Sequence, residues 1–135
     1  MKVRNIFHFL SKCSNIKGSE RRNVKENNRN IGRIDMVRHL ILWKLKESLT
    51  VEEKNTVLNN MKEHLEGLVG IVPGLVNLKI VINKMESSNA DVMLDSVLES
   101  EEALKGYQGH PAHVEVANTY VRPFTEVRMC IDYKE

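Results

Sequence analysis

Cysteine and long apolar runs, two features that often reveal the class of a protein, are scarce in this chain. Only two of its 135 residues are cysteines, Cys13 and Cys130, and their wide separation fits neither a metal-binding nor a redox motif. This usage gives no sign of an oxidising compartment. No apolar run approaches the roughly 18 residues that a membrane-spanning helix requires, and the apolar cluster at 6–10 is too short for a secretory signal. These absences predict a cytoplasmic protein that has no membrane partner.

The chain also lacks the signatures of several enzyme classes. It has no glycine-rich phosphate loop, no dinucleotide-binding fingerprint and no Ser or Cys nucleophile elbow. His110 and His113, with Glu115 nearby, lack a clear third metal ligand. We therefore expect no metal held by side chains and no cofactor. Main-chain oxygens that bind magnesium leave no trace in a sequence, so a magnesium ion stays open.

The formal net charge of +2 conceals an uneven distribution along the chain. Residues 1–35 hold nine Lys or Arg against three Asp or Glu, whereas residues 36–135 hold eleven against fifteen. An acidic body is a poor match for a phosphate backbone, so no nucleic-acid partner is expected. Residues 1–35 have no lasting hydrophobic period, and we interpret them as a disordered or non-native basic extension. A targeting peptide or a basic binding arm are alternatives, and we favour Met36 as the natural start of the working domain, 36–135.

From Met36 onward the hydrophobic pattern becomes regular. Residues 37–45 predict a strand that is apolar on both faces, because Leu40 and Leu42 alternate with the other apolar residues. Thr50 and Glu53 form a capping box that starts a helix at about residue 51. The later elements predicted from periodicity and turn residues are strands at 75–83, 92–99 and 125–133 and helices at 101–108 and 111–121.

The predicted order β-α-β-β-α-β, with a broken second helix, is that of an α+β ferredoxin-like fold. Two helices cover only one face of a four-stranded sheet. The other face still carries apolar residues, which a second copy of the chain would bury with its own sheet. The pattern therefore predicts a homodimer in which two sheets face each other or close into a shared barrel.

The break in the second helix brings together a phenol and two imidazoles, at 107–113. Gly109 is predicted to take a positive φ just beyond a helix end, and Pro111 to start the next helix. His113 would then lie in the first turn of that helix, where the dipole disfavours imidazolium and keeps the ring neutral, as a general base requires. The alternative is that the histidines of this corner only cap backbone groups.

Three stretches resemble the stress-responsive A/B barrel (Dabb) proteins: 37–46 at the start of the domain, Ile71-Val72-Pro73-Gly74-Leu75 before the second strand, and His110-Pro111-Ala112-His113. The resemblance covers about residues 36–134. It implies a dimeric α/β barrel of ferredoxin-like subunits. One plant branch of the family consists of polyketide cyclases that perform an intramolecular aldol condensation without a cofactor.

In that cyclase branch a Tyr and a His carry out the acid–base chemistry. The resemblance implies these roles for Tyr107 and His113, and it implies that His39 lines the same pocket. This chain has Val92 where the cyclases have a further pocket histidine. With His110 and Trp43 added as substrate-binding candidates, the expected site is a small-molecule pocket between the sheet and the broken helix.

Three hypotheses follow. The first is a homodimer that binds an unknown small molecule and performs acid–base chemistry on a carbonyl compound, with His113 as base and Tyr107 as hydrogen-bond donor to the oxyanion. The second is a non-enzymatic stress-response or structural dimer, in which His39 is a core histidine and Trp43 fills the core or the interface. The third is a cofactor-independent monooxygenase of the related dimeric barrels. An apolar cavity reached by Tyr107, His113 and His39 would favour the first or the third.

Overall fold

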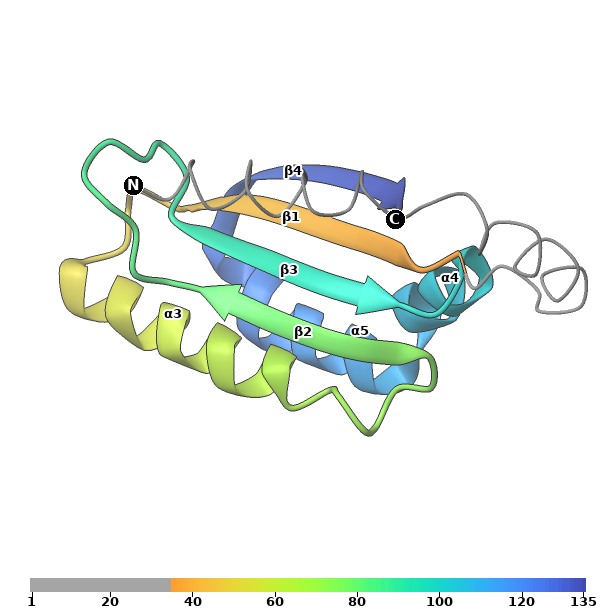
Figure 1. The fold of residues 1–135 in the computed structure, drawn as a ribbon. Helices are drawn as coiled ribbons and strands as arrows, with labels where there is room; N and C mark the ends of the chain where they lie inside the picture. Colours follow the sequence, from red (N-terminus) through yellow and green to blue (C-terminus); the bar gives the residue numbers. More distant parts are fainter. Residues whose placement is uncertain (1–34) are drawn as a thin grey trace, which may run out of the picture. The chain divides into compact units, whose positions relative to one another are not determined.

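The computed structural model describes residues 35–135, which form a four-stranded sheet with all of its helices on one face (Figure 1). Residues 1–34, which are all but the last residue of the predicted basic extension, lie outside the described residues. No helix of the described domain is long and apolar enough to cross a membrane. The elements are β1 (Val37–Leu45), α3 (Val51–Glu66), β2 (Leu75–Val81), β3 (Val92–Leu98), α4 (Glu101–Gly109), α5 (Pro111–Val116), the π-helical turn η1 (Ala117–Val121), the 3₁₀ turn η2 (Arg122–Phe124) and β4 (Thr125–Lys134).

The strand order β2-β3-β1-β4 confirms the predicted ferredoxin-like fold. Each neighbouring pair of strands is antiparallel, and the central strand β1 has β3 on one side and β4 on the other. Ile41 of β1, for example, pairs with Leu94 of β3 and with Cys130 of β4. Because side chains alternate across a strand, this register decides which residues of β3 and β4 share a face with the odd residues of β1.

The hydrophobic core lies between the helices and the face of the sheet that carries the odd residues of β1. Burying this apolar surface is the main term that stabilises the domain. His39 and Ser96 are the buried polar side chains on this face. The core residues with the least exposure are Val37, Leu45, Met61, Leu65, Ile80, Leu94, Leu98 and Tyr107.

The opposite face of the sheet, which we call the open face, has no helix over it (Figure 1). Large apolar side chains lie exposed on it along β1 and β4. Monomeric proteins rarely expose a contiguous apolar surface of this kind without a partner. The exposed apolar residues of these two strands are Leu42, Val127, Met129, Ile131 and Tyr133.

Strand β2 departs from the predicted alternation. Regular alternation along the predicted strand would place Val76 on one face with Leu78 and Ile80, but Leu78 and Ile80 are buried and Val76 is exposed. The pairing of β2 with β3 shifts between Leu75 and Asn77, which is the mark of a β-bulge. One extra residue in a strand moves all following side chains to the other face, so Leu75 is buried in place of Val76.

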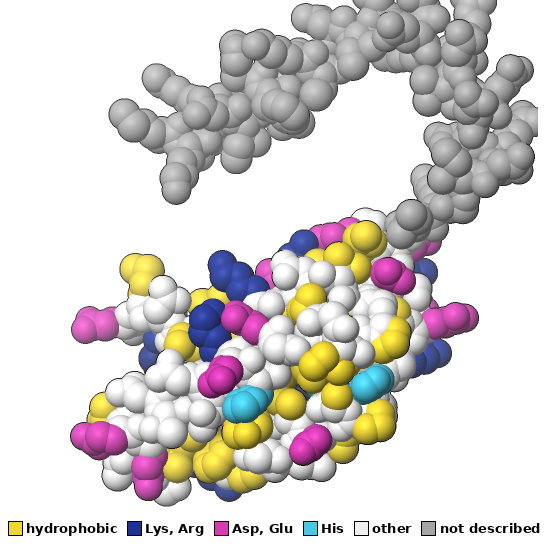
Figure 2. All heavy atoms as spheres, turned by 90° about the horizontal axis from the view of Figure 1, so that it is seen from below, with side chains coloured by type: hydrophobic (Ala, Val, Ile, Leu, Met, Phe, Trp, Pro, Cys, Tyr) yellow, Lys and Arg dark blue, Asp and Glu magenta, His cyan; other side chains and the backbone are white. Residues whose placement is uncertain are grey.

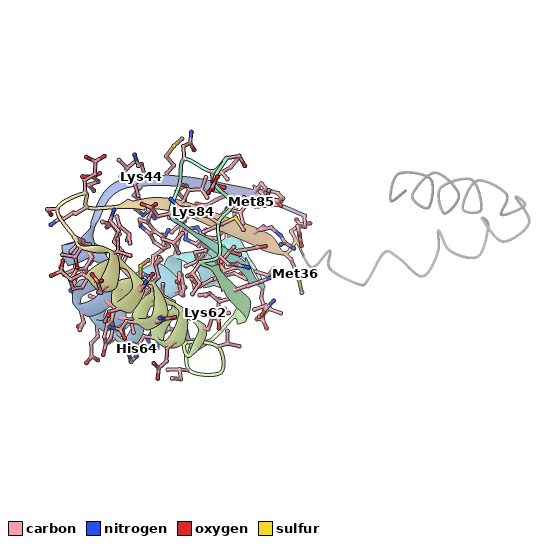
Figure 3. The ribbon with its side chains drawn as sticks, turned by 90° about the vertical axis from the view of Figure 1, so that its left-hand side faces the viewer. Met36, Lys44, Lys62, His64, Lys84 and Met85 are labelled. Carbon is pink, nitrogen blue, oxygen red and sulfur yellow. The ribbon has the colours of Figure 1, made fainter. Side chains whose placement is uncertain are left out.

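Helix α3 begins where its sequence predicts. Thr50 accepts a hydrogen bond from Glu53 N at 3.2 Å, and the Glu53 carboxylate accepts one from Thr50 N at 2.7 Å, which is the predicted capping box. Lys62 Nζ donates to the Ile80 carbonyl of β2 at 3.1 Å. His64 stacks on Tyr120 of η1 with ring centroids 3.8 Å apart. Figure 3 shows Lys62 and His64 on this helix. Figure 2 shows the helix side of the domain, over which acidic, basic and apolar side chains are interspersed.

The corner between α4 and α5 forms at a different residue from the one predicted. Gly109 is the last residue of α4 and has no positive φ. The chain turns instead at His110, whose extended backbone (φ −66°, ψ 133°) is the conformation that a following proline favours. The predicted helix 111–121 is also not a single α-helix, because α5 ends at Val116 and continues as the π-helical turn.

Gly74 offers a test of the fold. Its φ is +80°, and a Cβ atom at this position would lie 2.6 Å from Ala103 Cβ of α4. We expect Gly74→Ala to lower the free energy of unfolding by about 2 kcal/mol, since it combines a left-handed backbone with overpacking. Urea unfolding at a fixed protein concentration measures the change.

Gly109→Ala is the matched control for this prediction. A Cβ atom at Gly109 would meet nothing within 4 Å, and alanine favours a helical backbone more than glycine does. The control should therefore be at least as stable as the wild type. If Gly74→Ala were as stable as Gly109→Ala, the close approach of the Gly74 loop to α4 would be wrong.

Candidate functional site

A cavity of about 310 Å³ opens between the sheet and the broken helix. Its volume is at the lower end of the range for small-molecule pockets. The broken helix forms one wall, because the π-helical turn contributes Ala117 and Val121, and π-helical turns often occur at functional sites. The residues that line the cavity are His39, Ile41, Trp43, Leu65, Leu94, Tyr107, Gln108, His113, Ala117, Val121, Arg122, Thr125 and Arg128.

Tyr107 points its phenol into this space from α4. The side chain is almost fully buried, and its Oη is the buried side-chain polar atom of the described residues that has no hydrogen-bond partner. Burial raises the pKa of Tyr107 above its ordinary value of 10.0, with a smaller opposing effect from the charge of Arg128. The phenol therefore keeps its proton at neutral pH and has a hydrogen bond to offer to a ligand.

His113 lies next to Tyr107, with ring centroids 4.3 Å apart. Its Nδ1 is 3.2 Å from the Gln108 carbonyl oxygen, which can only accept, so Nδ1 carries the proton. Burial lowers the pKa of His113 below its ordinary value of 6.5, and the charges of Arg122 and Arg128 act in the same direction. The direction is the predicted one, and burial is its largest cause. At neutral pH the ring is neutral, and Nε2 is left as a base.

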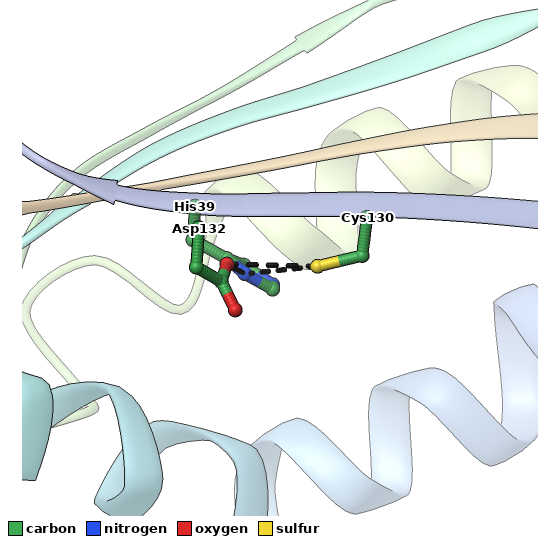
Figure 4. A group of neighbouring side chains, drawn as sticks. All are labelled: His39, Cys130 and Asp132. Carbon is green, nitrogen blue, oxygen red and sulfur yellow. Dashed lines mark hydrogen bonds and ion pairs between the residues drawn. The ribbon is translucent and has the colours of Figure 1, made fainter.

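His39 reaches the same cavity from the opposite wall, on β1. Its ring lies edge-on to Tyr107 with centroids 6.1 Å apart. Nδ1 donates to the carboxylate of Asp132, the residue opposite His39 on β4, and Figure 4 shows this pair on the side of the sheet where α4 and α5 run. Ser96 Oγ donates to the His39 carbonyl at 3.0 Å. Because the carboxylate fixes the proton on Nδ1, Nε2 of a neutral His39 is an acceptor.

His39 also belongs to a group that could hold a metal ion. Its Nδ1, the Cys130 thiol and the Asp132 carboxylate lie within 4.8 Å of one another (Figure 4). Imidazole, thiolate and carboxylate are the ligand types that Zn²⁺ prefers. The nitrogen is already engaged by Asp132, so a metal ion would have to replace that hydrogen bond. This group does not include His110 and His113, the pair considered from the sequence. The Nδ1 atoms of those two histidines hydrogen-bond to the main chain.

The remaining predicted residues divide between the cavity and its surroundings. Trp43 lines the cavity as part of the core. His110 does not line it: its Nδ1 accepts from Ala112 N at 3.1 Å, and it caps α5 as the structural alternative anticipated. Val92 is buried beside Trp43 without reaching the cavity.

Sequence analysis missed the three charged residues of the site. Arg122 and Arg128 line the cavity, and Asp132 orients His39. Asp132 and Arg128 belong to the polar half of β4, which alternates with the apolar residues of the open face. The available signal was the strand order of the ferredoxin-like fold, which places β4 beside β1. The register that sets Asp132 opposite His39 needed the coordinates.

A scan against protein-family models matches the stress responsive A/B barrel domain (Dabb) over residues 37–135. The chain belongs to the Dabb family. The match covers the whole ferredoxin-like domain and confirms the family predicted from the three sequence stretches.

Two relatives are 30% identical to this chain and are matched over most of their own length. Olivetolic acid cyclase from Cannabis sativa is 30% identical over 100 residues, which are 72% of this chain and 94% of the cyclase. A dimeric protein of unknown function with a ferredoxin-like fold, from Bacteroides fragilis, is 30% identical, with a TM-score of 0.70 and coverage of 74% of this chain and 96% of that chain. The hydroxynitrile lyase of Passiflora edulis shares the fold, at 16% identity and a TM-score of 0.62 over 76% of this chain and 94% of the lyase.

Proposed function

We propose that this chain is a homodimeric enzyme that performs cofactor-independent acid–base chemistry on a small carbonyl compound, in the manner of an aldolase or cyclase. The observation that carries the proposal is the convergence of Tyr107, His113 and His39 on one largely apolar cavity. A cavity with a few convergent polar groups is the usual form of a small-molecule site. An entirely filled core at this place would have favoured the structural dimer.

The protonation states suit the proposed division of labour. His113 Nε2 takes a proton from the carbon next to a carbonyl group, because its pKa is lowered by burial and the ring is neutral. Tyr107 keeps its proton and donates to the oxygen on which negative charge develops. His39, held by Asp132, orients the substrate. The enolate formed in this way attacks a second carbonyl carbon, and the resulting alkoxide receives the proton that His113 Nε2 had taken from carbon.

Two relatives support chemistry of this type. The relative from Cannabis sativa is named a cyclase, and the lyase from Passiflora edulis shows that the same fold supports an enzyme. The dimer is supported by the apolar open face and by similar structures described as dimeric, among them the one from Bacteroides fragilis. Roles on a shared fold still have to be tested at the site itself.

Proton exchange tests the proposal without knowledge of the natural substrate. We expect the full chain to accelerate exchange of the central hydrogens of octane-2,4-dione with D₂O, followed by NMR. His113→Ala should lower the rate by about 10²–10⁴-fold, the usual contribution of a general base. The wild-type rate should persist as the pH falls through 6.5, because the base titrates below the ordinary pKa of histidine.

His110→Asn is the matched control, since asparagine caps a helix well and His110 lies outside the cavity. This variant should keep the wild-type exchange rate. No acceleration by the wild type would favour the non-enzymatic dimer. Oxygen uptake with a quinol substrate, in place of exchange, would favour the monooxygenase.

A further inference from the structure

We infer that the ligand of this cavity carries a carboxylate group, which Arg122 and Arg128 bind, while its carbon chain lies along the apolar wall. The inference names a substrate class for the proposed function and rests on that function only for the reaction. Its own basis is the charge of the cavity lining.

The lining contains two guanidinium groups and no Asp or Glu side chain. Among the described residues neither Arg122 nor Arg128 forms a salt bridge, although other cations such as Arg38 and Lys134 do. Arg122 donates from Nη1 to the Asn118 side chain one helical turn earlier, a neutral contact that positions the group and leaves its charge unmatched. Within the described domain, the cavity lining therefore holds two positive charges that no carboxylate pairs with directly.

The positive charges of Arg122 and Arg128 act on ionisable groups of the cavity. Arg128 extends from the β4 position opposite Trp43, on the face that bears the cavity, and Arg122 extends from the turn that follows the π-helical wall. The charges of both arginines disfavour imidazolium at His113, and that of Arg128 favours phenolate at Tyr107. A neutral ligand would leave this positive field unopposed, whereas an anion would complement it.

The form of the two groups favours a carboxylate. The planar fork of a guanidinium matches the two oxygens of a carboxylate and binds them more strongly than it binds a neutral group. A large apolar part of the wall comes from Ile41, Trp43, Leu65, Leu94 and Val121. The complementary ligand is an amphipathic oxo acid, with its acid group at the arginines and its ketone beside Tyr107 and His113.

Trp43 makes the inference measurable, because it is the single tryptophan of the chain and lines the cavity. We expect octanoate to change the Trp43 fluorescence of the full chain and to bind at least tenfold more tightly than octanamide, its neutral analogue. Arg122→Gln and Arg128→Gln should each weaken octanoate about tenfold and leave octanamide unchanged, as expected for loss of a charged hydrogen bond. Lys46→Gln removes the same charge from an exposed position outside the cavity and should change neither affinity.

Equal binding of octanoate and octanamide, absence of binding by octanoate, or an unchanged preference in both arginine variants would overturn the inference. The assay measures binding without turnover, so its outcome does not depend on the proposed function. If octanoate binding depends on the arginines but His113→Ala exchanges protons at the wild-type rate, only the acid–base role is refuted. Exchange that depends on His113, together with no preference for the acid, would refute the carboxylate alone.

Discussion

Ile131→Asp is expected to convert the proposed dimer into a folded monomer. Ile131 lies near the middle of the exposed apolar residues of β4, with 60% of its surface exposed. In a dimer with two sheets face to face this side chain would be buried, and an unpaired buried carboxylate is among the most costly changes to an interface. A symmetric dimer contains the substitution twice. We therefore expect the dissociation constant to rise at least a thousandfold, measured by light scattering over a range of concentrations.

Ile71→Asp is the control for this substitution. Ile71 is 59% exposed, but it lies between α3 and β2 on the helix side of the domain, where it lines a hollow with His64 and Tyr120. The control should therefore remain dimeric. A wild-type chain that is monomeric at micromolar concentration would contradict the dimer. An Ile131→Asp variant that still has the mass of a dimer in solution would contradict the proposed interface.

The open face also has the layout of an interface. Its apolar residues lie along the central strand β1 and the edge strand β4, and Arg38 pairs with Asp95 at 2.9 Å and with Glu135 at 2.7 Å near one end of the same strands. An apolar centre with charged groups at its margin is typical of a protein–protein contact. The unpaired backbone of β4 at the sheet edge is a further surface that a partner strand would cover.

The fold was predictable from sequence because its signals are local. A strand that is apolar on both faces, a capping box at Thr50 and a proline at residue 111 each specify one element through chemistry between near neighbours. The order of these elements then leaves few topologies. The errors were local too, since neither the bulge near Leu75 nor the helical φ of Gly109 has a unique residue signature.

The site was predictable only in part, because it depends on contacts between distant residues. Tyr107 and His113 lie close in sequence, and their corner attracted attention directly. Asp132 and Arg128 reach the site only through the pairing of β4 with β1. Asp132 lies opposite His39, which is 93 residues earlier in the chain, and Arg128 lies opposite Trp43, which is 85 residues earlier. No local sequence pattern records such a pairing. Charge balance inside a cavity is likewise a property of the assembled lining.

Tyr107→Phe is expected to stabilise the protein and to disable it at the same time. The Oη of Tyr107 is buried without a hydrogen-bond partner, and an unsatisfied buried hydroxyl costs about 1–3 kcal/mol. Removing the oxygen and keeping the ring should raise the free energy of unfolding by about 1 kcal/mol, measured by urea unfolding at a fixed protein concentration. The same change removes the donor to the developing oxyanion and should slow proton exchange by about 10²–10³-fold, the usual effect of losing one such donor.

Tyr120→Phe separates this result from a general effect of removing a tyrosine hydroxyl. Tyr120 stacks on His64 outside the cavity, so its replacement should leave the exchange rate unchanged. A Tyr107→Phe variant that loses stability would mean that the hydroxyl has a partner within the folded chain. A stable variant that exchanges protons at the wild-type rate would remove Tyr107 from the chemistry. A variant that is more stable but exchanges protons more slowly identifies a hydroxyl that destabilises the fold and serves the reaction. A tyrosine that only packed in the core would show the gain in stability without the loss of rate.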